Sequence, residues 1–191
     1  MVRKTHHTLF EAELIMNICI DSNTITYLFQ AIDNYNPIND NDTNLRNERV
    51  AIIRIRFYIG GKLRILPSVR YELNKIPDID KWLHHITIAN WLDTRQYNLN
   101  DQQILNRKTY FLQAHNKDLD CQILAEAEAT KMNILLSYDN DFKKRLDQKA
   151  NGVTIISPSD FFASFNFQPG TSPKLRPQPP NPLSIETWWR I

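Results

Sequence analysis

Two acidic residues closely follow apolar runs in the sequence, at positions where side chains can do chemistry. Asp21 follows the run at residues 14–20, and Asp139 lies shortly after the run at residues 134–136. If both runs are strands of one parallel sheet, their carboxyl ends lie at the same edge, where open sheets bind ligands. We therefore treat the two carboxylates as candidates for one shared site.

Two further acids fall on the apolar stripes of predicted helices. Within residues 69–76, Glu72 shares the i, i+3, i+4 spacing of the apolar side chains, and Asp120 does the same within residues 120–127. Asp118 lies about 200° away from Asp120 around the helix axis and is predicted to be the N-cap. No Lys or Arg shares these stripes at helical spacing.

This arrangement of carboxylates points to a metal ion. An unpaired buried carboxylate costs several kcal/mol, and a divalent cation relieves that cost. Oxygen ligands without His or Cys favour Mg²⁺ or Mn²⁺ over zinc. Each acid also has a structural interpretation, because Asp at a strand end is a turn former and Asp120 in a first helical turn suits the macrodipole. Asp141 is either a fifth member of the site or the cap of a helix that starts at Phe142.

Other catalytic chemistries fit the sequence less well. The five histidines lack the spacing of a zinc site. Cys19 and Cys121 have no base nearby in the sequence that would activate a thiol, and we expect both to be buried and reduced. A phosphatase of the haloacid-dehalogenase type needs a second Asp where this chain has Asn23.

Strands and helices alternate along the chain and would bring these residues together. Four runs rich in Ile, Leu and Val are predicted to be buried strands, at residues 14–20, 63–66, 134–136 and 153–156. Helical patterns lie at residues 45–58, 68–76, 101–115 and 118–132, with Ser68 and Asn100 as predicted caps. This alternation indicates an α/β fold with a mainly parallel sheet. Residues 34–44, rich in Asn and Asp, are predicted to form a loop.

Length and net charge alone do not determine which class of protein this chain belongs to. A chain of 191 residues suggests one domain with an appendage, and its net charge of +2 does not by itself imply nucleic-acid binding. Residues 43–75, however, hold eight basic and two acidic residues, which form either a solvated helix face or a polyanion site. No apolar run approaches the roughly 20 residues of a membrane span, and we see no signal peptide, so we expect a cytoplasmic protein.

Four short motifs resemble those of PIN-domain ribonucleases. DSNTI (residues 21–25) is similar to the first motif of that family, and Glu72 resembles the glutamate of the second. DCQILAEA (residues 120–127) is similar to the third motif, and SYDNDF (residues 137–142) to the fourth. The resemblance runs in order from about residue 15 to residue 165. Within that family, the motifs resemble those of the VapC-type toxins of bacterial toxin–antitoxin pairs.

The resemblance implies a fold, a reaction and partners. The fold would be a PIN-like three-layer α/β/α sandwich with four or five strands, spanning residues 1–167. The reaction would be Mg²⁺- or Mn²⁺-dependent hydrolysis of RNA, and an antitoxin protein and a homodimer are candidate partners. The alternative is a PIN-like module that binds RNA or a protein without cutting.

Site residues carried over from the resemblance fall into three groups. The metal ligands would be Asp21, Glu72, Asp120 and Asp139, with Asp141 as the fifth. Ser22 and Asn23 would hydrogen-bond a ligand carboxylate or the phosphate. The RNA backbone would contact cations at Arg46, Arg49, Arg54, Arg56, Lys143, Lys144 and Arg145, of which the last three are otherwise a solvated face.

The C-terminal segment at residues 168–191 differs from the rest of the chain. Six of the ten prolines lie between residues 169 and 182, which favours an extended polyproline-type spacer. The segment ends in TWWRI. Because aromatic side chains are typical anchors, we expect Trp188 and Trp189 to dock on this domain, a second copy or a partner.

Overall fold

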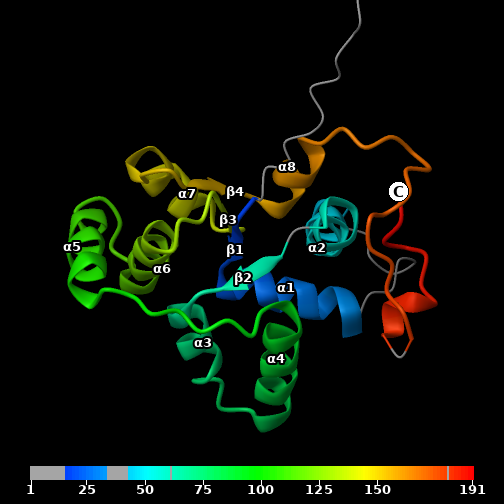
Figure 1. Cartoon of the computed structure of the whole chain (residues 1–191), viewed down its shortest axis with the longest axis horizontal. Helices are drawn as coiled ribbons and strands as arrows, with labels where there is room; N and C mark the ends of the chain where they lie inside the picture. The colour runs from blue at the N-terminus through cyan, green and yellow to red at the C-terminus, as the bar shows by residue number, and fades with distance from the viewer. Residues whose placement is uncertain (1–15, 34–42, 61, 180) are drawn as a thin grey trace, which may run out of the picture.

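A four-stranded parallel sheet forms the centre of the molecule (Figure 1). The computed structural model describes residues 16–33, 43–60, 62–179 and 181–191. The strands are β1 (Ile18–Ile20), β2 (Leu63–Ile65), β3 (Ile134–Leu136) and β4 (Thr154–Ile156), in the order β2-β1-β3-β4. All neighbouring strands are parallel, with Ile20 opposite Ile65 on one side and Leu136 on the other. The predicted α/β fold is confirmed.

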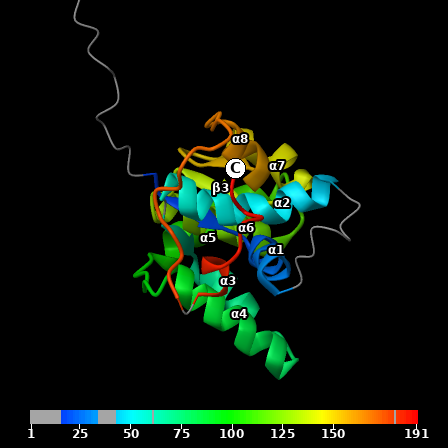
Figure 2. The ribbon, with the colours of Figure 1, turned by 90° about the vertical axis from the view of Figure 1, so that its right-hand side faces the viewer.

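Helices cover both faces of this sheet. The N-terminal half contributes α1 (Ser22–Asp33), α2 (Thr43–Arg54), the π-helical segment η1 (Ile55–Ile59), α3 (Pro67–Leu73) and α4 (Ile79–Leu92). The C-terminal half contributes α5 (Asp101–Leu112), α6 (Asp118–Ala129), α7 (Asn140–Leu146), η2 (Asp147–Lys149), α8 (Pro158–Ala163) and η3 (Pro182–Ser184). Helices α5 and α6 lie on one side of the sheet and α1, α2 and α8 on the other, which makes three layers (Figures 1 and 2). No helix among the described residues is both long and apolar enough to cross a bilayer.

The element boundaries differ from the predictions in informative ways. The first predicted strand shortens to Ile18–Ile20, and its first two residues lie outside the described part of the chain, as does most of the loop at 34–44. The predicted helix at 45–58 divides into α2 and η1. Helix α4 was not predicted, because Ile79, Leu83 and Trp91 are exposed and its apolar residues form no single stripe.

Of the caps predicted for α3 and α5, one is wrong and one is confirmed. Asn100 caps α5 by accepting from the Gln103 N–H at 3.0 Å. Ser68 does not cap α3, because Pro67 already starts the helix and the Glu126 carboxylate, from α6, accepts from the Ser68 N–H at 3.0 Å. Such an acceptor lies 58 residues away in sequence and could not be read from local pattern.

The C-terminal segment packs on the domain along η1. Trp189 is 1% exposed, and its ring centroid lies 4.7 Å from that of Phe57. The Arg54 guanidinium donates to the carbonyl oxygens of Trp189 and Arg190 at 3.0 and 3.1 Å. Trp189 therefore docks on this domain, as expected. Trp188 is only half-buried.

Candidate active site

Asp21 is a buried acid at the carboxyl edge of the sheet. Its Oδ1 accepts from the Thr24 N–H at 2.7 Å and so caps α1, while its Oδ2 accepts from the Ser137 hydroxyl at 2.5 Å. The side chain thus serves as a helix cap and still presents an oxygen toward the residues after β3. Burial raises the pKa of Asp21 to about 6, and the nearby charge of Asp120 adds to the rise.

Asp139 divides its two oxygens in the same way. Its Oδ1 accepts from the N–H groups of Asp141 and Phe142 at 2.9 and 3.0 Å, which makes Asp139 the cap of α7. Its Oδ2 accepts from the Lys117 ammonium at 2.5 Å. Burial by itself would raise the pKa of Asp139. The hydrogen bonds from Lys117 and from the helix N–H groups together have the larger effect, and they hold this pKa below its usual value. Of the two roles considered for Asp141, that of a cap for a helix starting at Phe142 is therefore wrong, because α7 starts at Asn140 and Asp139 caps it.

Asp120 lies next to two basic side chains that the sequence analysis did not select. The His115 Nε2 is 2.7 Å from Asp120 Oδ2, and the Lys117 Nζ is 3.8 Å from the same oxygen. Lys117 is the N-cap residue of α6, so the prediction of Asp118 as cap is wrong, and Asp118 instead pairs with Lys108. Lys117 precedes Asp120 by three residues, which is a helical spacing. The prediction that no Lys or Arg shares the stripe of Asp120 at helical spacing missed this residue.

His115 connects Asp120 to Asp141. Its side chain is fully buried and stacks on Phe142 with centroids 5.9 Å apart. Its Nδ1 lies 3.7 Å from Asp141 Oδ2 and has no hydrogen-bond partner among the described residues. Asp141 is exposed and pairs with Arg145 at 2.7 Å, and this bond lowers the pKa of Asp141. Asp120 and Asp141 therefore both lie next to the His115 ring, which stacks on Phe142.

Glu72 is the predicted ligand that the described contacts do not join to the others. It lies half-buried on α3, and its Oε2 is buried without a hydrogen-bond partner in the described part of the chain. The more buried glutamate is Glu126, which accepts from the Ser68 hydroxyl at 2.5 Å and from Gln122 at 3.1 Å. Glu126 was not predicted. Its bonds are those of a structural group that joins α3 to α6.

Ser22 and Asn23 do not hold the Asp21 carboxylate. Both lie in the first turn of α1, half-buried and exposed respectively, but the bonds to Asp21 come from Thr24 and Ser137. Ser137 also accepts from the Asp139 N–H at 3.1 Å through its hydroxyl. One hydroxyl thus ties the two strand-end acids together, and the sequence signal for it was Ser137 opening the fourth motif.

The predicted RNA-binding cations fall into two groups. On α7, Arg145 pairs with Asp141 and so lies near the other acids. Lys143 pairs with Asp160 at 3.7 Å, and Lys144 is exposed. On α2, the Tyr138 hydroxyl donates to the Glu48 carbonyl oxygen, so the middle of that helix lies near the residue before Asp139.

The predicted RNA-binding arginines of α2 and η1 lie at different distances from the contact between Tyr138 and Glu48. Arg49 is adjacent to it and donates to Gln30 at 3.2 Å, and Arg46 lies on the same helix, its side chain outside the described part. Arg54 binds the C-terminal segment, and Arg56 lies beside Trp91, 5.8 Å from its ring centroid. Eight residues of helix separate Arg56 from Glu48, about 12 Å. Arg54 and Arg56 are thus engaged away from the acids.

The residues present fit a divalent cation in type. Across the described ranges, no three His, Cys, Asp or Glu side chains stand together as a ready metal site. Instead the Lys117 ammonium lies between the carboxylates of Asp120 and Asp139, where it supplies the positive charge. Carboxylate oxygens are the donors Mg²⁺ and Mn²⁺ prefer, and the unpaired Glu72 Oε2 is a further donor of that kind.

Comparison of the whole sequence with models of known protein families and with curated proteins finds no match.

Proposed function

We propose that the protein is a metal-dependent ribonuclease that hydrolyses phosphodiester bonds of RNA. One observation carries this proposal: at the carboxyl edge of the sheet, Asp120 and Asp139 share the Lys117 ammonium, and the charge of Asp120 contributes to the raised pKa of Asp21. Asp21 is buried among them although this raises its pKa to about 6. Acids held together at such a cost, with one strongly perturbed, are characteristic of functional sites.

Each residue has a role in this reaction. Asp21, Asp120 and Asp139 would hold Mg²⁺ or Mn²⁺, with Glu72 and Asp141 as further ligands. When bound there, such an ion would supply charge neutralisation at the phosphate and would assist deprotonation of the attacking water. Ser137 and the Thr24 N–H fix the orientation of the Asp21 carboxylate.

Cations at the rim would offset the repulsion between these acids and RNA. Lys117 is 54% exposed, and Arg145 is 52% exposed, so both can reach a phosphate in solvent. A phosphate that attracts Lys117 would draw it away from Asp120 and Asp139 and leave those oxygens to the metal ion. The resemblance to VapC-type toxins extends the proposal to a toxin neutralised by a partner protein.

A second function is favoured by the same lysine. Because Lys117 already neutralises Asp120 and Asp139, the acids would be satisfied without a metal ion in a PIN-like module that binds RNA or a protein and does not cut. The two functions differ in whether a divalent cation changes the protein's activity on RNA.

The test is an RNA cleavage assay with purified protein, in excess Mn²⁺ or in chelator. We expect cleavage with Mn²⁺ and its loss in chelator and in Asp139→Asn, which keeps an oxygen to cap α7. The matched control is Asp118→Asn on α6, an acid that is 71% exposed and pairs with Lys108, and this variant should cut as wild type does. Metal-independent cutting, or full activity in Asp139→Asn, would exclude the proposed mechanism. RNA binding without any cutting would favour the second function.

A further inference from the structure

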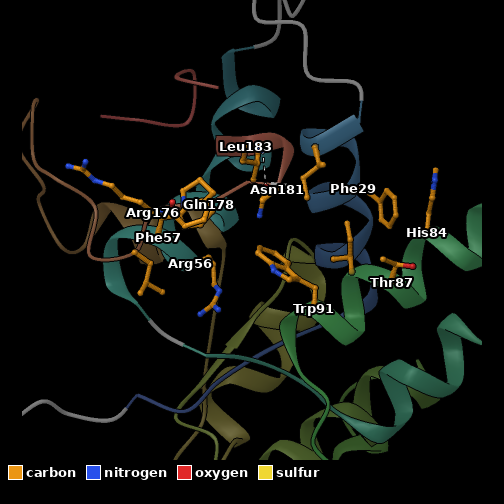
Figure 3. A pocket seen from close by; sticks show the side chains of 14 residues that line it. Phe29, Arg56, Phe57, His84, Thr87, Trp91, Arg176, Gln178, Asn181 and Leu183 are labelled. Atoms are coloured by element: carbon orange, nitrogen blue, oxygen red, sulfur yellow. Dashed lines mark hydrogen bonds between the residues drawn. The ribbon is translucent and has the colours of Figure 1, made fainter. Parts of the chain in front are cut away.

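A cavity lies away from the acids, between α1, η1, α4 and the C-terminal segment (Figure 3). Its volume is about 710 Å³, within the range of sites that enclose small molecules. Helix α1 begins beside Asp21 and reaches this cavity at Phe29, so seven residues, or about 10 Å along the helix axis, separate the two places.

Aromatic and aliphatic side chains make up most of the cavity wall. Phe29, Phe57 and Trp91 come from α1, η1 and α4, and Leu183 comes from the C-terminal segment. Phe57 and Leu183 are buried, while Trp91 is 40% exposed, so the apolar wall continues to the mouth. A ligand with a flat hydrocarbon body would bury its surface here.

The charged groups in this wall are all basic. Arg56 and Arg176 line the cavity together with His84, and the described lining residues include no carboxylate. The guanidinium carbon of Arg56 lies 5.8 Å from the ring centroid of Trp91, so the charge lies next to the aromatic wall (Figure 3). Burial lowers the pKa of Arg56. An anionic group beside it would stabilise the charged form and gain a charge-assisted hydrogen bond.

The fourth wall is the C-terminal segment, which local contacts hold in shape. The Leu175 N–H donates to the Phe57 carbonyl at 2.9 Å, and the Asn181 side chain accepts from the Leu183 N–H at 2.9 Å to start η3. More than 80 residues separate this wall from the others in sequence. Side chains from four segments converge on one cavity whose volume suits a compact ligand of small-molecule size.

We propose that this cavity binds a small amphipathic anion: a flat aromatic or hydrocarbon body that carries one carboxylate, sulfonate or phosphate next to Arg56. The body would lie against Trp91 and Phe57. Because Leu183 and Asn181 form one wall, the bound ligand would also hold the C-terminal segment in place. This site does not depend on the proposed nuclease activity.

Two dyes with one ring system test the proposal on the full chain. 8-Anilinonaphthalene-1-sulfonate carries an anionic group, and N-phenyl-1-naphthylamine is its neutral counterpart. We expect a single saturable site for the sulfonate by fluorescence titration. Arg56→Gln should weaken sulfonate binding about tenfold, the worth of one charge-assisted hydrogen bond, and leave the neutral dye nearly unchanged. Arg95→Gln, at an arginine outside the cavity, is the matched control and should bind both dyes as wild type does.

A second variant protects the test from a folding defect in Arg56→Gln. Thr87 is exposed on α4 and lines the cavity, so Thr87→Trp would fill the space, and both dyes should be lost while the far-ultraviolet circular dichroism and melting temperature stay as in wild type. Equal binding of both dyes to wild type and both variants would overturn the proposal, because the dye would then be adventitious. Absence of saturable binding would overturn it as well, and so would dye release on dimerisation, since a second copy would then cover this surface.

Discussion

Replacing Asp21 by asparagine removes the charge of the most deeply buried acid in the candidate active site. The side chain keeps an oxygen for the Thr24 N–H, so the cap of α1 is retained. Burial raises the pKa of Asp21 from its usual 3.8 to about 6, and each pKa unit is worth about 1.4 kcal/mol. Ionised Asp21 therefore lowers the free energy of unfolding at neutral pH by up to about 3 kcal/mol without a metal ion. We expect Asp21→Asn to be more stable than wild type at pH 7 in chelator, by some part of this amount.

The pH dependence of stability tests independently whether the charge of Asp21 destabilises the folded protein. Because the folded protein binds the Asp21 proton more tightly than the unfolded chain, wild-type stability should fall as pH rises from about 4 through 6. Below pH 4 the carboxyl is protonated in both states, so the advantage of Asp21→Asn should shrink toward zero.

Urea unfolding at several pH values, in chelator and in Mg²⁺, measures both effects. Asp101→Asn, at an exposed acid in the first turn of α5, is the control and should change stability by a few tenths of a kcal/mol. Mg²⁺ should stabilise wild type more than Asp21→Asn. If Asp21→Asn is less stable than wild type at pH 7 in chelator, the carboxylate is structural and the reasoning fails.

Three further outcomes follow from contacts in the structure. Lys117→Met should tighten Mn²⁺ binding about fivefold by calorimetry, because a bound ion no longer displaces two exposed ion pairs worth about 0.5 kcal/mol each; unchanged or weaker binding would contradict this. Trp189→Ala should cost about 3–5 kcal/mol of stability in urea unfolding, since the ring is buried, whereas the half-buried Trp188→Ala should cost clearly less; equal losses would argue against the docked segment. Glu126→Gln should lose about 1–2 kcal/mol of stability and leave Mn²⁺ affinity unchanged, because its bonds cap α3; a loss of Mn²⁺ binding would instead make it a ligand.

Features set by local pattern were predictable from the sequence. The apolar runs identify the strands because side chains buried on both faces must be apolar, and each strand-end Asp follows from its run. From the sequence, Asp139 was either a turn former at a strand end or a site residue. The structure shows one oxygen of Asp139 capping α7 and the other accepting from Lys117, so a structural role leaves one oxygen directed toward the other acids.

Features set by distant contacts were not predictable. His115 and Lys117 lie in the connection between α5 and α6, and tertiary packing places Lys117 beside Asp139, 22 residues further along the chain. Glu126 reaches Ser68 across 58 residues. Helix α4 packs through His85, Ala89 and Leu92, while Ile79, Leu83 and Trp91 on the same helix are exposed, so its apolar residues do not mark one buried stripe.

The strand order also determines where the chain can be divided. β1 lies between β2 and β3, so the N-terminal half of the molecule ends with one edge of β1 unpaired until β3 arrives. The connection at residues 94–100, in which Asn98 is exposed, separates a half that carries Asp21 from a half that carries Asp139. Two fragments cut at Asn98 would each lack part of the acidic cluster and would regain it only by pairing β1 with β3. Such fragments would report on the association of any two proteins fused to them.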